Sequence, residues 1–447
     1  MNKIKEFYLK NKTIIAMGVM TALVLLANFF YELWPIATAM LVFFFATSSF
    51  KEHVCYCVYM AVFSGVSPIY ASCILLCLIC VAVRYVVDVL KNRKQFFKLP
   101  FFVTTAIVVV FSLIFGKVDT NGFFNWGLFV GILYFVYFAY VYHEEIDVKK
   151  AFNFLFGAVL VSAVLGFSLL WVDALKIKTY PFDGTYNRLR LFTLNVNHLA
   201  MMCMFGIAFF VYEMFNNVIV QPKSFAFFKD KQFWFKLFKI AFLCVIGLMT
   251  LSKAFLLVLA LVLVYVFVLL ILKLKTKSLL IILPLMGAIA VLCLIFKDFV
   301  WNLLSRFVVY DAWESLLSKI FTGRTDIWIT YINEIFSSPL KAIFGVGLLT
   351  QDVVAKGPHN VLIYLVYRVG FVGLVALCVL VWLYAKQSSK KIKPTILNCL
   401  LFLVYVVFAL EEMIFSDRFF LFLIFAIILM LKNNEKIEEN AQNIEKN

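Results

Sequence analysis

The stretch AFLLVLALVLVYVFVLLIL, residues 254–272, contains no charged side chain and is followed directly by KLKTK, residues 273–277. About 20 mostly apolar residues in a helix cross the hydrocarbon core of a bilayer, and in lipid a helix satisfies its own backbone hydrogen bonds. Transmembrane β-strands would instead alternate apolar and polar residues over about ten positions. Since this stretch does not alternate, it predicts a membrane-spanning α-helix that ends at a basic connection.

The rest of the chain has the same character. Of its 447 residues, 64% are hydrophobic and 15% are charged, and the mean hydropathy is +0.98, whereas soluble domains have about 25% charged residues. Further apolar runs lie near 13–33, 35–50, 54–67, 69–90, 101–116, 123–142, 151–175, 193–215, 235–250, 278–296, 359–385, 395–411 and 418–431. The sequence therefore predicts an all-α, polytopic transmembrane helical bundle of 12–14 spans. The count is open because each of the short runs 35–50 and 54–67 is either a full span or half of a re-entrant pair.

Clusters of Lys and Arg occur on alternate connections between the apolar runs. They lie at 3–12, 91–98, 149–150, 223–239, 273–277, 386–393 and in the tail from Lys432. Because basic residues concentrate on the cytoplasmic side of membrane proteins, both termini are expected to be cytoplasmic. The same rule accounts for most of the formal charge of +16, so no nucleic-acid partner is expected. No small-residue cleavage site follows the first apolar run, which we expect to be a retained helix rather than a signal peptide.

The predicted organisation has four parts. Residues 1–180 form N-terminal transmembrane helices, 181–400 a core that includes a large outer loop at 297–358, 401–431 the C-terminal helices and 432–447 a polar cytoplasmic tail. Within the loop, residues 301–321 and 325–336 have apolar side chains at helical spacing, and Pro339 is expected to stop the second segment. Two amphipathic helices suggest a cap on the membrane interface, or a lid that only seals the bundle.

The cysteines favour helix packing over a metal site or a disulfide framework. The ten cysteines lie in or beside apolar runs, and none lies in the long outer loop. Cys73, Cys77 and Cys80 share a helical face, but no His or carboxylate is near them in the sequence, so small-residue helix packing is the favoured interpretation. Neither a metal nor another cofactor is expected.

Ionisable side chains at the outer ends of helices are the candidate functional residues, because a charge in the membrane is costly unless it is paired or faces water. They are Arg188, Arg190, Lys253, Arg324, His359, Arg368 and, in the turn 411–418, Glu411, Glu412, Asp417 and Arg418. Lys253 lies in an outer turn too short to be a solvated loop. His359 follows Gly357–Pro358 at an expected helix start, where the helix dipole disfavours the protonated form and suits a base.

Together these residue types point to a diphosphate. Arg matches phosphate oxygens in pairs, and Lys adds a point charge. Histidine, with an ordinary pKa of about 6.5, can take a proton from an alcohol near neutral pH. The combination suggests attack of a hydroxyl on a substrate with a lipid-linked diphosphate leaving group. The apolar bundle would hold the lipid, and the cations would stabilise the departing charge.

At these residues the sequence resembles the bacterial O-antigen ligase and O-antigen polymerase family. In the family pattern a His is followed by Asn, Ser or Gln, nine residues, Gly, two residues, and then Gly, Thr or Tyr. Here His359–Asn360 is followed at those spacings by Gly370 and Gly373. Three other stretches are similar to family motifs: RLRLFTLNVNHLA with Arg190, Asn195 and Asn197; TLSKAF with Lys253 where Arg is usual; and GRTDIW with the later FGVG, which contains Gly345 and Gly347. The resemblance covers roughly residues 185–385.

The resemblance implies roles for individual residues. His359 would activate the acceptor hydroxyl, Arg190 and Arg324 would bind the diphosphate, and Lys253 would assist. Arg188, Asn197 and Asn360 are candidates for support, and Glu412 is a candidate partner for a cation or a sugar. The implied enzyme is a metal-independent, inverting glycosyltransferase of surface polysaccharide assembly, O-antigen or capsule, in a bacterial inner membrane. Its partners would be an undecaprenyl-diphosphate-linked glycan donor, a glycan acceptor, the bilayer, and a chain-length regulator and flippase.

Several alternatives stay open at the sequence level. A polymerase and a ligase share the same machinery and differ in the acceptor, a second lipid-linked unit or a lipid A core; we favour the polymerase. A lipid-linked oligosaccharide flippase would show repeat-related halves and charges near the midplane of the bilayer. A metal-dependent membrane glycosyltransferase would need paired acidic residues in its first outer loop, where only Glu32 is present.

Overall fold

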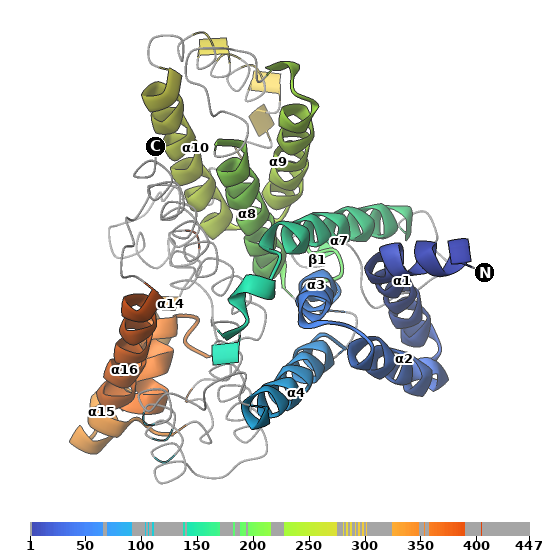
Figure 1. Ribbon diagram of the computed structural model, residues 1–447. Coiled ribbons are helices and arrows are strands. Elements are labelled where there is room, and N and C mark those ends of the chain that lie inside the picture. The colour runs from blue at the N-terminus through green and yellow to red at the C-terminus, as the bar shows by residue number, and fades with distance from the viewer. Residues whose placement is uncertain are drawn as a thin grey trace, which may run out of the picture.

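The structure is a computed structural model. It describes residues 2–65, 69–91, 137–138, 141–169, 182–183, 188–193, 195–215, 228–274, 324–347 and 357–388, with a few single residues elsewhere. These residues form eleven α-helices, two short 3-10 helices and one two-stranded ladder (Figure 1).

The elements have the following bounds. The α-helices are α1 (Asn2–Phe29), α2 (Trp34–Ala46), α3 (Phe50–Ala61), α4 (Ile69–Leu90), α7 (Val148–Leu169), α8 (Val196–Glu213), α9 (Lys231–Met249), α10 (Lys253–Leu274), α14 (Arg324–Phe336), α15 (Pro339–Phe344) and α16 (Val361–Ser388). The 3-10 helices are η1 (Tyr31–Leu33) and η2 (His143–Glu145), and the antiparallel strands are β1 (Phe182–Asp183) and β2 (Arg188–Leu189).

Four of the helices are long and apolar enough to cross a membrane. They cover Val148–Ser168, Val196–Glu213, Lys231–Met249 and Lys253–Ile271. The prediction of a helical chain with several possible membrane spans is therefore confirmed for the described residues. The expected division into four parts is not tested by this architecture.

Helix α8 lies at the centre of the packing. Its side chains are buried almost without exception, as expected for a helix that is apolar on every face. Phe209 of α8 stacks on Phe152 of α7 with ring centroids 4.2 Å apart. On the α9 side, Gly206 allows Leu243 to approach so closely that an added Cβ would lie 2.7 Å from its Cδ1. The connection before α8 therefore leads into a fully packed helix.

Helices α2 and α3 bear on the choice between a re-entrant pair and two crossings. With 13 and 12 residues, each is only about 20 Å long. At the join between them, Lys51 forms an ion pair of 3.4 Å with Asp147, just before the start of α7. Beyond the end of α3, Gly65 N donates to Phe192 O at 2.7 Å, in the segment that follows α7 and precedes α8. The two ends of α3 thus contact segments that precede and follow α7, but neither α2 nor α3 is among the four helices long and apolar enough to cross a membrane, so the choice between a re-entrant pair and two crossings stays open.

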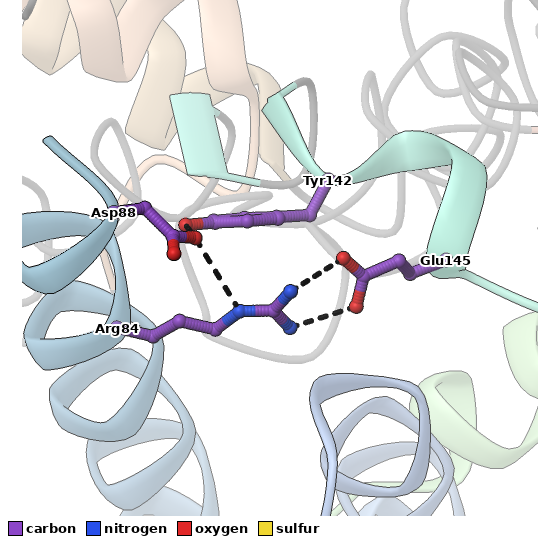
Figure 2. A network of polar contacts seen from close by, with 4 residues as sticks. All are labelled: Arg84, Asp88, Tyr142 and Glu145. Atoms are coloured by element: carbon purple, nitrogen blue, oxygen red, sulfur yellow. Dashed lines mark hydrogen bonds and ion pairs between the residues drawn. The ribbon is translucent and has the colours of Figure 1, made fainter. Parts of the chain in front are cut away.

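An arginine joins α4 to the segment before α7 (Figure 2). The guanidinium of Arg84 donates from Nη1 and Nη2 to the two carboxylate oxygens of Glu145, at 2.7 and 2.6 Å. It also lies 4.4 Å from the centroid of the Tyr142 ring, and the Tyr142 hydroxyl donates to Asp88 at 2.8 Å. Because the paired donors match a carboxylate, this contact fixes the angle between the two segments.

A charged cluster lies between α7, α8 and α9, in which Glu213, Lys236 and Lys239 are buried and Lys149 is exposed. Glu213 forms ion pairs of 3.5 Å with Lys149 and with Lys236, and Lys239 donates to Asn153 Oδ1 at 2.5 Å. Three aromatic rings surround the Lys239 ammonium at centroid distances of 4.4, 4.7 and 5.4 Å: Phe235, Phe210 and Phe156. The cluster therefore holds its cations by pairing and by ring faces.

Helices α14, α15 and α16 form a bundle of their own (Figure 1). The amphipathic helix expected at 325–336 is present as α14, and Pro339 begins α15 rather than only ending α14, in agreement with the preference of Pro for a first helical turn. Tyr331 of α14 packs edge-on against Tyr367 of α16, with ring centroids 4.9 Å apart. The other amphipathic segment expected, 301–321, lies outside the described residues.

Candidate functional site

Arg188 joins two connections that are far apart in the sequence. It lies on β2, and its Nε donates to Thr250 O at 2.9 Å. Its Nη2 donates to Asn197 Oδ1 at 3.2 Å. Asn197 is in the first turn of α8, and Thr250 follows α9. Arg188 and Asn197, both candidates for support, therefore hold the turn between α9 and α10 beside the start of α8.

Arg190 has an unused hydrogen-bond donor. Its Nε is buried and has no hydrogen-bond partner among the described residues. Its backbone is fixed, since Thr193 donates to the Arg190 carbonyl through N at 3.1 Å and through Oγ1 at 2.6 Å. A buried guanidinium N–H without an acceptor is costly, and an anionic ligand would relieve that cost.

Lys253 is the first residue of α10. The preceding turn is held by Thr250, whose hydroxyl donates to Gly247 O at 2.6 Å, and by Ser252, which lies at the helix start with its backbone carbonyl accepting from Leu256 N at 3.2 Å. Thr250 and Ser252 are both buried. Lys253 thus begins its helix from a packed turn rather than from a solvated loop.

His359 lies just outside the N-terminus of α16. The cap of this helix is Asn360, whose Oδ1 accepts from Leu362 N at 3.0 Å and from Ile363 N at 3.2 Å. Asn360 is therefore a helix cap, which is a structural role. It fixes the backbone next to His359 at the positive end of the helix dipole.

Three residues other than glycine have a positive φ among the described residues; one is the candidate His359, and the other two lie within two residues of a candidate. They are Leu191 (φ 51°), Leu251 (φ 51°) and His359 (φ 46°). Leu191 follows Arg190, and Leu251 precedes Ser252 and Lys253. Such conformations are uncommon for side chains with a Cβ and concentrate at functional sites.

Arg324 and His359 are brought to the same end of the α14–α16 bundle. Arg324 is the first residue of α14, and Trp328 follows one turn later on the same face. Trp328 Nε1 donates to Pro358 O at 2.7 Å, directly before His359. Further along, Phe336 of α14 contacts Phe371 of α16 with ring centroids 6.4 Å apart. The two helices therefore run in the same direction and begin side by side.

The glycines of the resembling motifs meet in a break of α16. Gly370 has φ 66° and ψ −178° inside the helix, and the carbonyls of Tyr367 and Arg368 accept from Val346 N at 2.8 Å and from Gly347 N at 3.0 Å. The approach requires glycine, since a Cβ on Gly370 would lie 2.2 Å from Ile343 O. Buried Arg368 donates to Gly347 O at 3.3 Å, which fixes the same junction.

The helix starts divide the candidates into two groups. One contains Arg188, Arg190, Asn197 and Lys253 around the starts of α8 and α10, and the other contains Arg324, His359 and Asn360 around the starts of α14 and α16. Glu412 and the turn 411–418 lie outside the described residues. Among the described residues, no three His, Cys, Asp or Glu side chains gather as metal ligands.

Two residues that position the site were not among the sequence candidates for it: Thr250 and Trp328 contribute a carbonyl and an indole N–H. Arg368, which was a sequence candidate, supports the break in α16. Trp328 could have been found from its spacing of four residues from Arg324. Thr250 gives no such signal, because any residue supplies a carbonyl. No family model, curated protein or solved structure matches the chain, so the resemblance to the O-antigen ligase and polymerase family rests on the motifs alone.

Proposed function

We propose that the protein is a membrane glycosyltransferase that polymerises undecaprenyl-diphosphate-linked repeat units of a surface polysaccharide. The chain crosses a bacterial inner membrane 12–14 times with both termini in the cytoplasm, and the reaction takes place on the outer side. The proposal is supported by the motifs, by the charge pattern and by the arrangement of the helix starts.

One observation carries the proposal: the cations assigned to the site lie at helix starts or in the connection that leads into one. Arg188 and Arg190 lie eight and six residues before α8, Lys253 and Arg324 are the first residues of α10 and α14, and His359 precedes α16 by two residues. A helix start carries a partial positive charge, which favours anions and disfavours cations. Cations at several such starts suit a ligand with more than one negative charge, as at other phosphate-binding helix ends.

In the proposed reaction His359 takes the proton from the acceptor hydroxyl. The acceptor oxygen then forms a bond to the anomeric carbon of the donor sugar, while the bond from that carbon to the diphosphate oxygen breaks. The electron pair leaves with the lipid diphosphate, where Arg324 and Arg190 stabilise the added charge. Attack opposite the leaving group inverts the anomeric carbon.

The polar contacts agree with the proposed topology. Lys51 and Asp147 form an ion pair, and so do Lys149 and Glu213. All four residues belong to connections or helix ends that the alternation of charge assigns to the cytoplasmic side. Arg188, by contrast, contacts the turn before Lys253, and both are assigned to the outer side.

The proposal is tested by deleting the gene and restoring it with wild type, His359→Ala or His143→Ala. His143 lies in η2, on the side assigned to the cytoplasm, and so provides the same chemical change away from the site. At equal membrane levels of tagged protein, His359→Ala should fail to restore long polysaccharide on a gel, and His143→Ala should restore it. Normal long chains with His359→Ala would refute the assignment of the base.

The pattern in the deletion strain separates the related functions. Loss of a polymerase leaves single repeat units on the surface, whereas loss of a ligase leaves long chains that are not attached to lipid A core. Loss of a flippase leaves single lipid-linked units on the inner side of the membrane. Only the first result supports the proposal as stated.

A further inference from the structure

The helix α14 has three faces, and one of them is both apolar and exposed. The face on α16 is buried and carries Tyr331 and Ile335. A second face carries exposed polar residues at helical spacing: Asp326, Thr330, Asn333 and Ser337. The third face, continued by α15, carries exposed apolar residues: Ile329, Ile332, Phe336, Leu340 and Ile343. Phe336 and Leu340 are 63% and 59% exposed, so no part of the chain that the structure describes covers this face.

The apolar face continues onto α16. Phe336 contacts the Phe371 ring, and Phe371, Val375 and Val379 are themselves exposed. Residues 366–385 of α16, up to the basic segment that starts at Lys386, form a stretch of the length that crosses the hydrocarbon core. On this count Phe371 lies about 8 Å inside the outer boundary of the hydrocarbon. Phe336 lies beside it and therefore at a similar depth.

The non-helical backbone after α15 has its polar groups satisfied, as a position inside the hydrocarbon core requires. Non-helical backbone is tolerated inside a membrane only where its polar groups are satisfied by the protein. Residues 345–347 are buried: Gly345 N donates to Lys341 O, and Val346 N and Gly347 N donate to the Tyr367 and Arg368 carbonyls beside the break at Gly370. The charged side chains near the turn between α14 and α15, Glu334 and Lys341, form an ion pair of 2.6 Å, which lowers the cost of placing them near lipid.

We propose that residues 324–347 form a re-entrant helical hairpin whose exposed apolar face contacts the acyl chains of the outer leaflet. It descends along α16, with the polar face toward water, instead of lying flat on the membrane surface. The occupant of the apolar face is the bilayer, because the face is continuous with the exposed apolar face of α16. The proposal does not depend on the proposed reaction.

Photocrosslinking in intact membranes tests the proposal. A benzophenone amino acid is placed singly at Phe336, Leu340 or Asn333, with Val375 of α16 as the positive control; all four side chains are exposed, so folding should persist. With phosphate-labelled phospholipids, we expect lipid adducts at Phe336 and Leu340 at a level within about threefold of Val375, and at least tenfold less at Asn333. The proposal would be overturned by equal labelling at Asn333 and Phe336, by absence of lipid adducts at both Phe336 and Leu340, or by adducts there that are mainly with protein.

Discussion

The close approach of Gly345 and Gly370 predicts that a single methyl group will open the junction between α15 and α16. In Gly370→Ala the new Cβ would lie 2.2 Å from Ile343 O and 2.5 Å from Gly345 N. These are backbone atoms, which cannot rotate away. The backbone angles of Gly370, φ 66° and ψ −178°, belong to a region that is essentially restricted to glycine.

The size of the effect follows from two terms. The backbone strain costs about 1–3 kcal/mol. If the segment after α15 moves away from α16, the clash is relieved, but two buried hydrogen bonds, from Val346 N and Gly347 N, are broken. Their loss costs about 1–3 kcal/mol each. A local loss of about 3–9 kcal/mol is therefore expected, which is a large part of the stability of a typical domain.

Purified protein in detergent is heated and the fraction that stays monodisperse is measured by size-exclusion chromatography. Gly370→Ala should lower the apparent midpoint by on the order of 5 °C or more. The control is Gly157→Ala in α7, where a Cβ has no atom within 4 Å and where Ala is a better helix former. Equal midpoints for Gly370→Ala and Gly157→Ala would refute the close approach.

Three further predictions concern single contacts. Trp328→Phe removes the donor to Pro358 O, so it should reduce polysaccharide assembly at least tenfold without lowering membrane levels; unchanged assembly would contradict its role in positioning His359. Arg84→Lys loses the paired hydrogen bonds to Glu145 and should lower stability by up to about 1 kcal/mol, because the pair is partly exposed; a midpoint equal to wild type in low salt would contradict this. Burial would raise the pKa of Glu52, in the first turn of α3 before the apolar run 54–67, but hydrogen bonds from Ser49 and the charge of Lys12 outweigh it and lower the pKa below 4.5. Its contribution to stability is therefore present above pH 4.5 and lost as the pH falls through the lowered pKa. Glu52→Gln should flatten the dependence of the apparent melting midpoint on pH in that range. A pH dependence equal to that of wild type would show that the Glu52 carboxylate is not its source.

The helices could be predicted from the sequence because their signals are local. The apolar run 254–272 reappears as α10, Lys253–Leu274. The run 235–250 corresponds to α9, but the helix starts earlier, at Lys231, because Asp230 caps it by accepting from Gln232 N at 2.8 Å. Caps of this kind extend a helix beyond its apolar run into polar residues, where periodicity gives no signal.

The contacts that bring the separate segments of the candidate site together could not be predicted in the same way. Arg188 contacts Thr250 across 62 positions, and Trp328 contacts Pro358 across 30. In both pairs the acceptor is a backbone carbonyl, which every residue type offers. The motif in the sequence could indicate that Gly370 is important. The reason is visible only in three dimensions: the backbone of residues 345–347 packs against the break of α16 at Gly370.

The two ends of the bundle differ in how their helix starts are capped. At the end assigned to the cytoplasm, Asp147 and Asp230 cap α7 and α9 with carboxylates. At the outer end, α8 and α16 have the neutral caps Asn195 and Asn360, and neither has an acidic residue in its first turn. Since Asp caps a helix as well as Asn does and also interacts favourably with the dipole, the neutral caps are not required for stability. They leave the positive potential at the starts of α8 and α16 available to an anion, whereas α14 has Asp326 in its first turn.

This contrast makes a last prediction. Asn360→Asp keeps the cap but adds a negative charge next to His359, where a diphosphate would bind in the proposed reaction. The apparent melting midpoint should therefore stay the same or rise, while polysaccharide assembly at equal membrane levels should fall at least tenfold. The reverse change at the other end, Asp230→Asn, also keeps a cap and should leave assembly unchanged. Full assembly with Asn360→Asp would mean that the outer helix starts do not serve an anionic substrate.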